Sequence, residues 1–304
     1  MFNGILVAAA LFLSPPVVQP GDSTLVMFWN IENFFSWKAE AMKNKYWTRK
    51  KFLRECQAIS KAIFWITDER GQPPDLIGLA EVENKKVLET LLRETSLRRL
   101  GYGIVHYESP DPRGIDVALL FRKDRFKLLY SKPLRIDGVV TRDILLAGFE
   151  RGPGDSLAVL VNHHPSKYGQ NSFWKRHAAM VRLAEATDSL FAAGQSEIIA
   201  MGDFNDTPGS TSEYSEKMVN LAVEPARKGI GTIKYSGKWE MIDMFFISPA
   251  IASRTPGAVM TVERIPFLMV GDGGSFGEKP LRTYSGPRYI GGVSDHCPIT
   301  LVIR

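Results

Sequence analysis

The most informative part of the sequence is Ile198-Ile199-Ala200-Met201-Gly202-Asp203-Phe204-Asn205-Asp206-Thr207-Pro208-Gly209. Its apolar first half predicts a buried strand, and the Gly, Asp, Asn and Pro residues that follow predict a tight loop. Asp203 and Asn205 are two positions apart, so extended backbone places both side chains on one face and Phe204 on the other. A carboxylate and an amide at the end of a strand can hold a divalent cation, a phosphate or an attacking water. The same residues also form ordinary Asx turns, so the rest of the chain has to decide.

The composition is that of a globular protein with a basic surface. A length of 304 residues suffices for one large α/β domain or two small ones. The net charge of +5 and the pI near 9.1 favour a phosphate-bearing partner, although the charges are scattered along the chain. Cys56 and Cys297 lie far apart, which excludes a disulfide framework and a CxxC-type zinc site, and we expect two buried thiols.

The N-terminus predicts a targeting segment. Ile5 to Leu13 is an apolar run that Ser14-Pro15-Pro16 ends; it is too short to span a bilayer and is typical of a secretory signal. Residues 1–4 lack the Lys or Arg that such a signal usually carries. We expect residues 1–22 to be a leader, residues 23–304 to be the functional domain, and the protein to be secreted or periplasmic; with a misread start it would be cytoplasmic. No other segment predicts a membrane anchor.

The periodicity of apolar residues predicts a mixed α/β chain. Strands are expected at 24–29, 75–80, 103–108, 115–122, 126–133, 144–149, 157–162, 197–201, 241–247, 259–264 and 299–303, and helices at 47–67, 86–100 and 173–192. Residues 266–292 are rich in Gly and Pro and predict a long loop. This order of elements favours two sheets packed face to face with helices outside, and no linker divides the chain.

Polar residues that carry chemistry follow the ends of many predicted strands; Asp243 lies inside one strand, and Asp295 and His296 precede the last. These residues are Asn30, Glu32, Glu81, His163, His164, Asp203, Asn205, Asp243, Asp295 and His296. Functional sites of α/β proteins form at strand ends, so we expect these side chains to converge on one rim. Each also has a purely structural interpretation, as a turn residue, a helix cap or a hydrogen-bonded core acid. The repetition of the pattern at six places favours a shared site.

These motifs together resemble the endonuclease/exonuclease/phosphatase superfamily, which has the deoxyribonuclease-I-like fold. The matching segments occur in the family's order and are Trp-Asn-Ile-Glu-Asn (29–33), Ala-Glu-Val (80–82), Asn-His-His-Pro-Ser (162–166), Gly-Asp-Phe-Asn-Asp (202–206), Ile-Asp (242–243) with Phe-Ile-Ser (246–248), and Ser-Asp-His-Cys-Pro (294–298). The resemblance implies an α/β four-layer sandwich, in which two mostly antiparallel sheets are flanked by helices. It also implies a Mg²⁺ or Mn²⁺ ion held chiefly by Glu81, with Asn30 and Asp295 beside it.

The resemblance further implies roles in hydrolysis. Asp203 would orient or deprotonate the attacking water, and Asn205 would hold a phosphate oxygen. His296 would act on the scissile phosphate as base or donor, and Asp243 would fix its tautomer. His163 would face the phosphate.

Neighbouring basic residues are candidates for substrate contacts. His163 fits the motif better than His164, and adjacent residues of a strand point to opposite faces. Arg113, Arg142 and Lys167 are candidate phosphate contacts, and for each the alternative is a solvated surface charge or ion pair.

The function that these features predict is a monomeric, metal-dependent phosphoesterase that attacks its substrate directly with water. Nucleic acid, in particular DNA, is the leading substrate because backbone phosphates attract Lys and Arg. A small-molecule or lipid-headgroup phosphatase, acting on inositol phosphates or sphingomyelin, uses the same chemistry. Residues 207–220 contain only one basic residue, Lys217, which argues against an inositol-phosphate pocket. The alternative of another class, a non-catalytic binding module, would be expected to have lost some of these acids or the terminal His.

Overall fold

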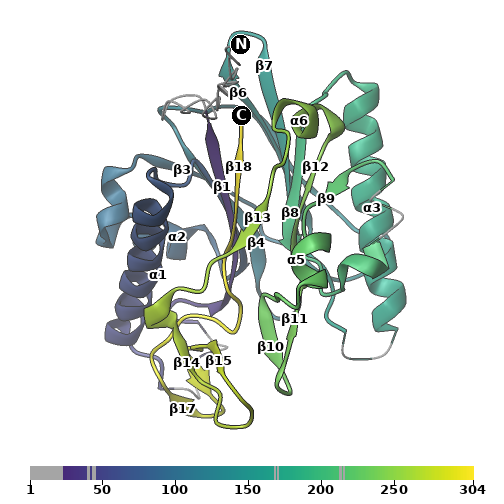
Figure 1. The fold of residues 1–304 in the computed structure, drawn as a ribbon. Coiled ribbons are helices and arrows are strands. Elements are labelled where there is room, and N and C mark those ends of the chain that lie inside the picture. Colours follow the sequence, from purple (N-terminus) through teal and green to yellow (C-terminus); the bar gives the residue numbers. More distant parts are fainter. Residues whose placement is uncertain are drawn as a thin grey trace, which may run out of the picture.

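The computed structural model describes residues 23–39, 42, 46–167, 169, 171–211, 214 and 216–304. The predicted leader, residues 1–22, lies outside the described residues. Two six-stranded sheets pack face to face, with helices on their outer faces (Figure 1). The predicted four-layer α/β sandwich is therefore confirmed. Within the described residues, no helix combines the length and the apolar character that a membrane span requires.

The first sheet is antiparallel except at its centre. Its strands are β1 (Thr24–Phe34), β2 (Leu76–Val82), β3 (Tyr102–His106), β4 (Asp116–Arg122), β13 (Met260–Val262) and β18 (Ile299–Ile303), in the order β13-β18-β1-β2-β4-β3. β1 and β2 are parallel, which requires a crossover, and α1 (Arg49–Arg70) supplies it. Successive residues of β1 point to opposite faces of the sheet: Met27 and Trp29 pack toward α1, and Val26 and Phe28 face the second sheet.

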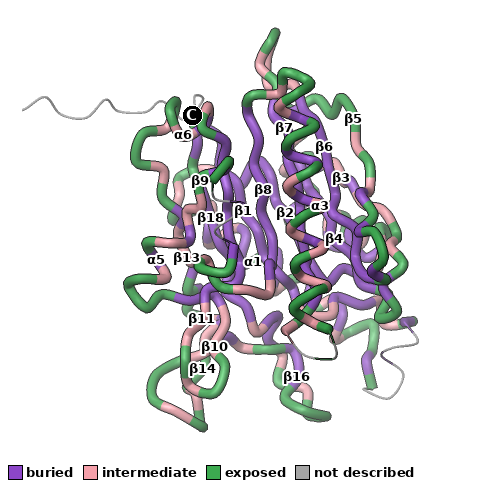
Figure 2. Tube along the Cα trace, turned by 90° about the vertical axis from the view of Figure 1, so that its right-hand side faces the viewer, coloured by how far each residue is buried: buried purple, intermediate pink, exposed green. Residues whose placement is uncertain are grey.

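The second sheet repeats this scheme. Its strands are β5 (Lys127–Leu134), β6 (Ile144–Gly152), β7 (Asp155–His163), β8 (Ile198–Asp203), β9 (Val219–Asn220) and β12 (Asp243–Ile247), in the order β5-β6-β7-β8-β12-β9. Here the parallel pair is β7 and β8, and α3 (Ser172–Ala192) makes the crossover. β8 is buried along its whole length, as its unbroken apolar run predicts (Figure 2).

The remaining elements are short. They are α2 (Lys85–Glu94), η2 (Ser96–Arg99), η3 (Pro208–Thr211), α5 (Val223–Arg227), β10 (Ile233–Tyr235), β11 (Lys238–Glu240), α6 (Pro249–Arg254), η4 (Pro266–Leu268), β14 (Met269–Gly271), β15 (Glu278–Pro280), β16 (Tyr284–Ser285) and β17 (Arg288–Tyr289). Of these, α2 packs beside α1 on the outer face of the first sheet (Figure 1). The prediction of one long loop over residues 266–292 is wrong in part, because β14 pairs with β15 and β16 with β17. The helix expected at 86–100 ends at Glu94, where Thr95 caps η2 instead.

Both cysteines are free and buried, as expected. Burial raises the pKa of the Cys297 thiol to about 12, so it stays protonated at neutral pH although it follows His296 in the chain. A nucleophilic role for this thiol is thereby disfavoured, because the thiolate is the reactive form.

The packing of β7 against β8 predicts that Gly202 is required for stability. A Cβ at Gly202 would lie 2.3 Å from the carbonyl oxygen of Asn162 on β7. We expect Gly202→Ala to lower the free energy of unfolding by about 1–3 kcal/mol, because the backbone has to shift. The matched control is Gly209→Ala, where a Cβ would meet no atom within 4 Å. Urea unfolding measures both, and equal free-energy changes in the two variants would contradict the assignment.

Candidate active site

Three adjacent strands of the second sheet carry three site residues in one row. His163 at the end of β7 is in register with Asp203 at the end of β8, and Asp203 is in register with Asp243 at the start of β12. All three side chains are buried. β8 ends at Asp203. This end of β8 lies on the rim of the sandwich where Figure 1 shows β10 and β11.

The first sheet reaches the same rim through irregular backbone. The register of β1 with β2 shifts after Asn30, and that of β2 with β4 shifts at Glu81. Glu32, Asn33 and Glu81 have positive φ angles of 38°, 54° and 63°. Such values are uncommon for residues other than glycine and concentrate at functional sites, where bulges redirect side chains. As a result, Glu81 Oε2 accepts a hydrogen bond of 2.8 Å from the backbone nitrogen of Asn33.

The Asp203 carboxylate is the point at which distant parts of the chain meet. Its Oδ2 accepts a hydrogen bond of 3.0 Å from Asn30 Nδ2. The same oxygen lies 3.6 Å from His163 Nε2 and 3.8 Å from His296 Nε2. Its Oδ1 accepts a hydrogen bond of 2.9 Å from the backbone nitrogen of Asn205. The convergence that the strand-end pattern predicts is therefore present around this carboxylate.

A carboxylate fixes the orientation of the His296 ring. Asp243 Oδ2 lies 2.7 Å from His296 Nδ1, and both side chains are buried. The His296 backbone is anchored as well, since its carbonyl accepts from Trp29 Nε1 at 2.9 Å and its nitrogen donates to Ser294 Oγ at 2.9 Å. With Nδ1 engaged, Nε2 is the nitrogen that faces Asp203.

Burial and neighbouring charges set the protonation of this centre. Burial, together with the Asp243 carboxylate, raises the pKa of Asp203 to about 7. Burial opposes protonation of His296, but the Asp243 and Asp203 carboxylates outweigh it and raise the His296 pKa well above its ordinary range. Burial and the nearby Arg142 guanidinium lower the pKa of His163 well below its ordinary range. At neutral pH the site thus has one cationic imidazole and one neutral imidazole.

The acids Glu81 and Glu32 lie beside this centre. Glu81 Oε1 lies 4.0 Å from His163 Nε2. Burial, followed by the nearby Asp295, raises the pKa of Glu32 to about 7, and Glu32 Oε2 is buried without a hydrogen-bond partner. Oxygen ligands of this kind suit Mg²⁺ or Mn²⁺. Asp203, Asp243 and His296 also have ligand atoms within 4.8 Å of one another, a second arrangement compatible with a metal ion.

Arg282 is a site residue that the sequence reasoning missed. Its Nε donates to Glu32 Oε1 at 2.9 Å, and its Nη2 lies 3.4 Å from Asp295 Oδ2. The guanidinium thereby holds two like charges close together. Arg282 lies in the segment predicted as a loop, 250 positions from Glu32, and no local motif marks it.

The comparisons with known proteins give the family. A family model described as Endonuclease/Exonuclease/phosphatase family matches residues 25–304. The chain belongs to this family. Membership places it among proteins with the phosphoesterase fold, and no curated protein matches it by sequence.

Solved structures of the family's fold resemble the chain over most of its length. Truncated TDP2 from Caenorhabditis elegans is 16% identical with a TM-score of 0.62, over 93% of this chain and 98% of that one. The human Nocturnin catalytic domain with bound sulfate is 18% identical with a TM-score of 0.58, over 93% and 94%. The mannosyl-6-phosphatase Bt3783 of Bacteroides thetaiotaomicron is 15% identical with a TM-score of 0.60, over 92% and 99%. These likenesses show the fold.

Two of the predicted substrate contacts, Asn205 from the family resemblance and Arg142 as a neighbouring basic residue, hydrogen-bond to the carbonyl of His164. Asn205, with a φ of 50°, donates its Nδ2 to the carbonyl of His164 at 3.0 Å. Arg142 is buried; its Nη1 donates to Asp111 at 2.9 Å and its Nη2 donates to the same His164 carbonyl at 2.6 Å. Both side chains therefore fix the end of β7, and the structure gives them positioning contacts.

The other two candidates for substrate contacts, Arg113 and Lys167, each form an ion pair with a glutamate. Arg113 is half exposed and its Nη2 lies 3.3 Å from Glu81 Oε2, an ion pair of the kind given as its alternative. Lys167 Nζ lies 2.6 Å from Glu240 Oε2 of β11, and the Lys167 side chain is about one-third exposed.

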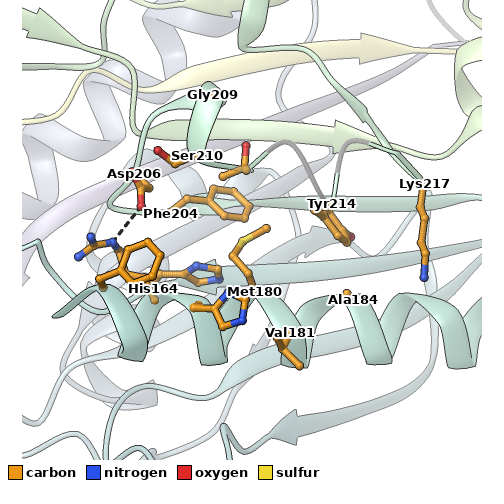
Figure 3. A pocket seen from close by; sticks show the side chains of 14 residues that line it. His164, Met180, Val181, Ala184, Phe204, Asp206, Gly209, Ser210, Tyr214 and Lys217 are labelled. Carbon is orange, nitrogen blue, oxygen red and sulfur yellow. Dashed lines mark hydrogen bonds and ion pairs between the residues drawn. The ribbon is translucent and has the colours of Figure 1, made fainter. Parts of the chain in front are cut away.

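His164 faces away from the acids, as its position next to His163 predicts. Its ring packs edge-on against Phe204, with centroids 4.9 Å apart. Both residues line a cavity of about 280 Å³ between α3 and the segment after β8 (Figure 3). Burial and Arg142 lower the His164 pKa to about 3, so the ring is neutral. At the cavity's edge Arg176 Nε donates to Asp206 Oδ2 at 3.0 Å.

The raised pKa of Asp203 predicts how the stability of the metal-free protein changes with pH. The folded-state pKa of about 7 exceeds the ordinary value of 3.8, so the folded state holds the extra proton between these values. The stabilisation is complete below the lower pKa and is lost as the pH rises through the higher one. In EDTA, melting temperatures at about pH 5 and pH 8 should differ more for wild type than for Asp203→Asn. The same pH dependence in both proteins would contradict the pKa.

Proposed function

We propose that the chain is a divalent-metal-dependent phosphoesterase that hydrolyses phosphodiester bonds of nucleic acid by direct attack of water. The observation that carries this proposal is the position of the buried Asp203 carboxylate, whose Oδ2 lies within 4 Å of both His163 and His296. The Asp203 carboxylate can take a proton from the attacking water, and the cationic imidazole of His296 can stabilise the negative charge that grows on the phosphate.

Asp203 and His296 have separate roles in the proposed reaction. Asp203 accepts the proton of the attacking water, and Asn30 Nδ2 and the Asn205 backbone nitrogen hold the carboxylate in place. His296, braced through Nδ1 by Asp243, donates from Nε2 to the phosphate. The side chains do this without forming a covalent intermediate, because no activated nucleophile is present among the described residues of the site.

Glu81, Glu32 and Asp295 would hold the cation. Bound Mg²⁺ or Mn²⁺ would neutralise phosphate charge and polarise the phosphorus–oxygen bond. Arg282 keeps Glu32 and Asp295 close enough to share the ion, and Arg113 contacts Glu81 from the solvent side.

Two hairpins beside the site support nucleic acid as the substrate. β10–β11 and β14–β15 lie next to each other at this end of the molecule (Figure 1), and Lys234 Nζ donates to the Phe276 carbonyl at 2.7 Å to join them. Phe276 is 100% exposed and Tyr235 is 56% exposed. Exposed aromatic rings beside basic residues stack on unpaired bases. One structure of the same fold is that of D. rerio TDP2 complexed with single strand DNA product.

The second candidate is a phosphatase of small molecules. It rests on the likeness to the mannosyl-6-phosphatase Bt3783, which shares the fold as fully as the TDP2 structures do. The Asp203 centre would serve either substrate equally, so the residues around the rim have to discriminate.

An activity panel tests the proposed chemistry. Supercoiled plasmid, a single-stranded oligonucleotide, mannose 6-phosphate, inositol phosphates and sphingomyelin are each offered with Mg²⁺ or Mn²⁺. We expect nucleic acid to be cleaved, EDTA to abolish turnover, and Asp203→Ala to lower kcat by about 100- to 10,000-fold. Full activity in EDTA would refute the metal requirement. Release of a small phosphate with nucleic acid left intact would move the substrate to the second candidate.

Phe276→Ala tests the contact with bases separately from the chemistry. Stacking contributes about 1–3 kcal/mol per base, so KM for the oligonucleotide should rise by about 5-fold or more. Hydrolysis of bis(p-nitrophenyl) phosphate, which has no base, should be unchanged. The matched control is Phe173→Ala, since Phe173 is also largely exposed but lies on α3. An unchanged KM in Phe276→Ala would remove this support for nucleic acid.

A further inference from the structure

Glu55 is a buried acid that the proposed chemistry does not use. It lies in the second turn of α1, on the buried face of the helix, and is 3% exposed. Its Oε1 lies 2.5 Å from the hydroxyl oxygen of Thr283, and its Oε2 has no hydrogen-bond partner among the described residues. An ionised carboxylate that is buried with one oxygen unpartnered is costly, so this environment favours the protonated acid.

The Thr283 hydroxyl has more acceptors around it than it can donate to. Besides Glu55, its oxygen lies 3.1 Å from each of two carbonyl oxygens, those of Gly292 and Val293. A hydroxyl has one proton, and a carbonyl oxygen only accepts. With Glu55 ionised, all three neighbours would be acceptors that compete for this proton. With Glu55 protonated, the acid donates to the Thr283 oxygen, and the Thr283 proton remains for the carbonyls.

Burial of Glu55 acts in the same direction. Burial raises the pKa of Glu55 well above its ordinary range, and the nearby Glu32 charge adds to this, although the contact with Thr283 opposes it. A protonated Glu55 also adds no further negative charge beside Glu32, which already lies near Asp295.

Thr283 belongs to two paired backbone segments, residues 281–283 and residues 290–293. The Gly292 nitrogen donates to the Arg282 carbonyl at 3.0 Å, and a Cβ at Gly292 would lie 1.8 Å from a carbonyl oxygen of the first segment. The two segments are therefore packed tightly against each other. They follow the hairpin β14–β15, at the end of the sandwich where α1 begins (Figure 1). The hydroxyl contact ties this pair of segments to the helix.

Both segments lead to groups of the active site. The first carries Arg282, whose Nε donates to Glu32 and whose Nη2 lies beside Asp295. The second continues into Ser294, whose Oγ donates to the Asn30 carbonyl at 2.6 Å. A contact that fixes these segments to α1 therefore fixes the backbone from which Arg282 and Asp295 reach the site.

We propose that Glu55, as a protonated acid, is a positioning residue of the active site, and that its hydrogen bond to Thr283 holds Arg282 and Asp295 in place from α1. The inference rests on the proposed function, since it assigns Glu55 a part in the site at Glu32.

Infrared difference spectroscopy tests the proton on Glu55. At neutral pH, the spectrum of the metal-free wild type minus that of Glu55→Gln should contain the carbonyl band of a protonated carboxylic acid. A carboxylate band in its place would overturn the proposal.

Exchange of the Arg282 Nε–H with solvent, followed by NMR, tests the positioning in the metal-free protein. Glu55→Leu cannot donate to Thr283, so exchange should become about 5-fold faster, the effect of one lost hydrogen bond. Glu55→Gln, whose amide can donate, should keep the wild-type rate. The matched control is Glu69→Leu, since Glu69 is exposed on the same helix. Thr283→Val removes the same hydrogen bond from the other side and should also speed exchange.

Mn²⁺ affinity, measured by electron paramagnetic resonance, extends the test to the metal site. We expect the Kd to rise about 10-fold in Glu55→Leu and to stay near the wild-type value in Glu55→Gln. The double variant Glu55→Leu/Thr283→Val should bind no more weakly than the weaker single variant, because both changes remove one shared hydrogen bond.

Melting temperatures and the wild-type protein separate the possible failures. A folded Glu55→Leu with unchanged Arg282 exchange would overturn the proposal, whatever its melting temperature. A Glu55→Gln that loses Arg282 protection as Glu55→Leu does would overturn it as well. Wild-type protein that binds no Mn²⁺ and hydrolyses no phosphate ester would refute the proposed function, and the metal-free exchange rates would still decide the role of Glu55.

Discussion

The Asp203 carboxylate is buried at the end of β8, and the rest of the site is arranged to keep it there. Its Oδ2 contacts Asn30 from the first sheet, His163 from the neighbouring strand and His296 from the C-terminal segment. An ionised carboxylate in such a place is unfavourable, which is why its pKa rises to about 7. The hydrogen bonds from Asn30 and the Asn205 backbone, and the charge of His296, offset part of this cost. Residues in strained backbone, such as Glu81 with its φ of 63°, belong to the same arrangement.

The architecture explains why one rim collects these groups. Each sheet has a parallel pair at its centre, β1 with β2 and β7 with β8, and the carboxyl ends of all four strands carry site residues. The crossover helices α1 and α3 lie on opposite outer faces, so they leave this rim open (Figure 1). The hairpins that surround the rim come from the C-terminal third of the chain. We propose that these hairpins set the substrate, because proteins that share a fold differ in the residues around its site.

Much of the fold and the centre of the site could be predicted from the sequence because both depend on local patterns. The apolar run before Gly202 marks a buried strand, and the opposite directions of His163 and His164 follow from strand geometry. Contacts that depend on chain geometry could not be predicted. Arg282 reaches Glu32 from a segment with no motif, through two small hairpins that a Gly- and Pro-rich composition hides. The sequence suggests that Arg142 is a surface cation, but in the structure it is buried and donates a hydrogen bond to the buried Asp111.

The central claim is that one divalent ion lies among the acids beside Asp203. A crystal structure of the protein soaked in Mn²⁺, with anomalous data at the manganese edge, tests it most directly. We expect an anomalous peak within bonding distance of Glu81 and within reach of Glu32 and Asp295, with Asp203 facing both His163 and His296. A peak elsewhere with none at Glu81, or Glu81, Asp203 and His296 pointing into separate regions, would refute a metal site at Glu81.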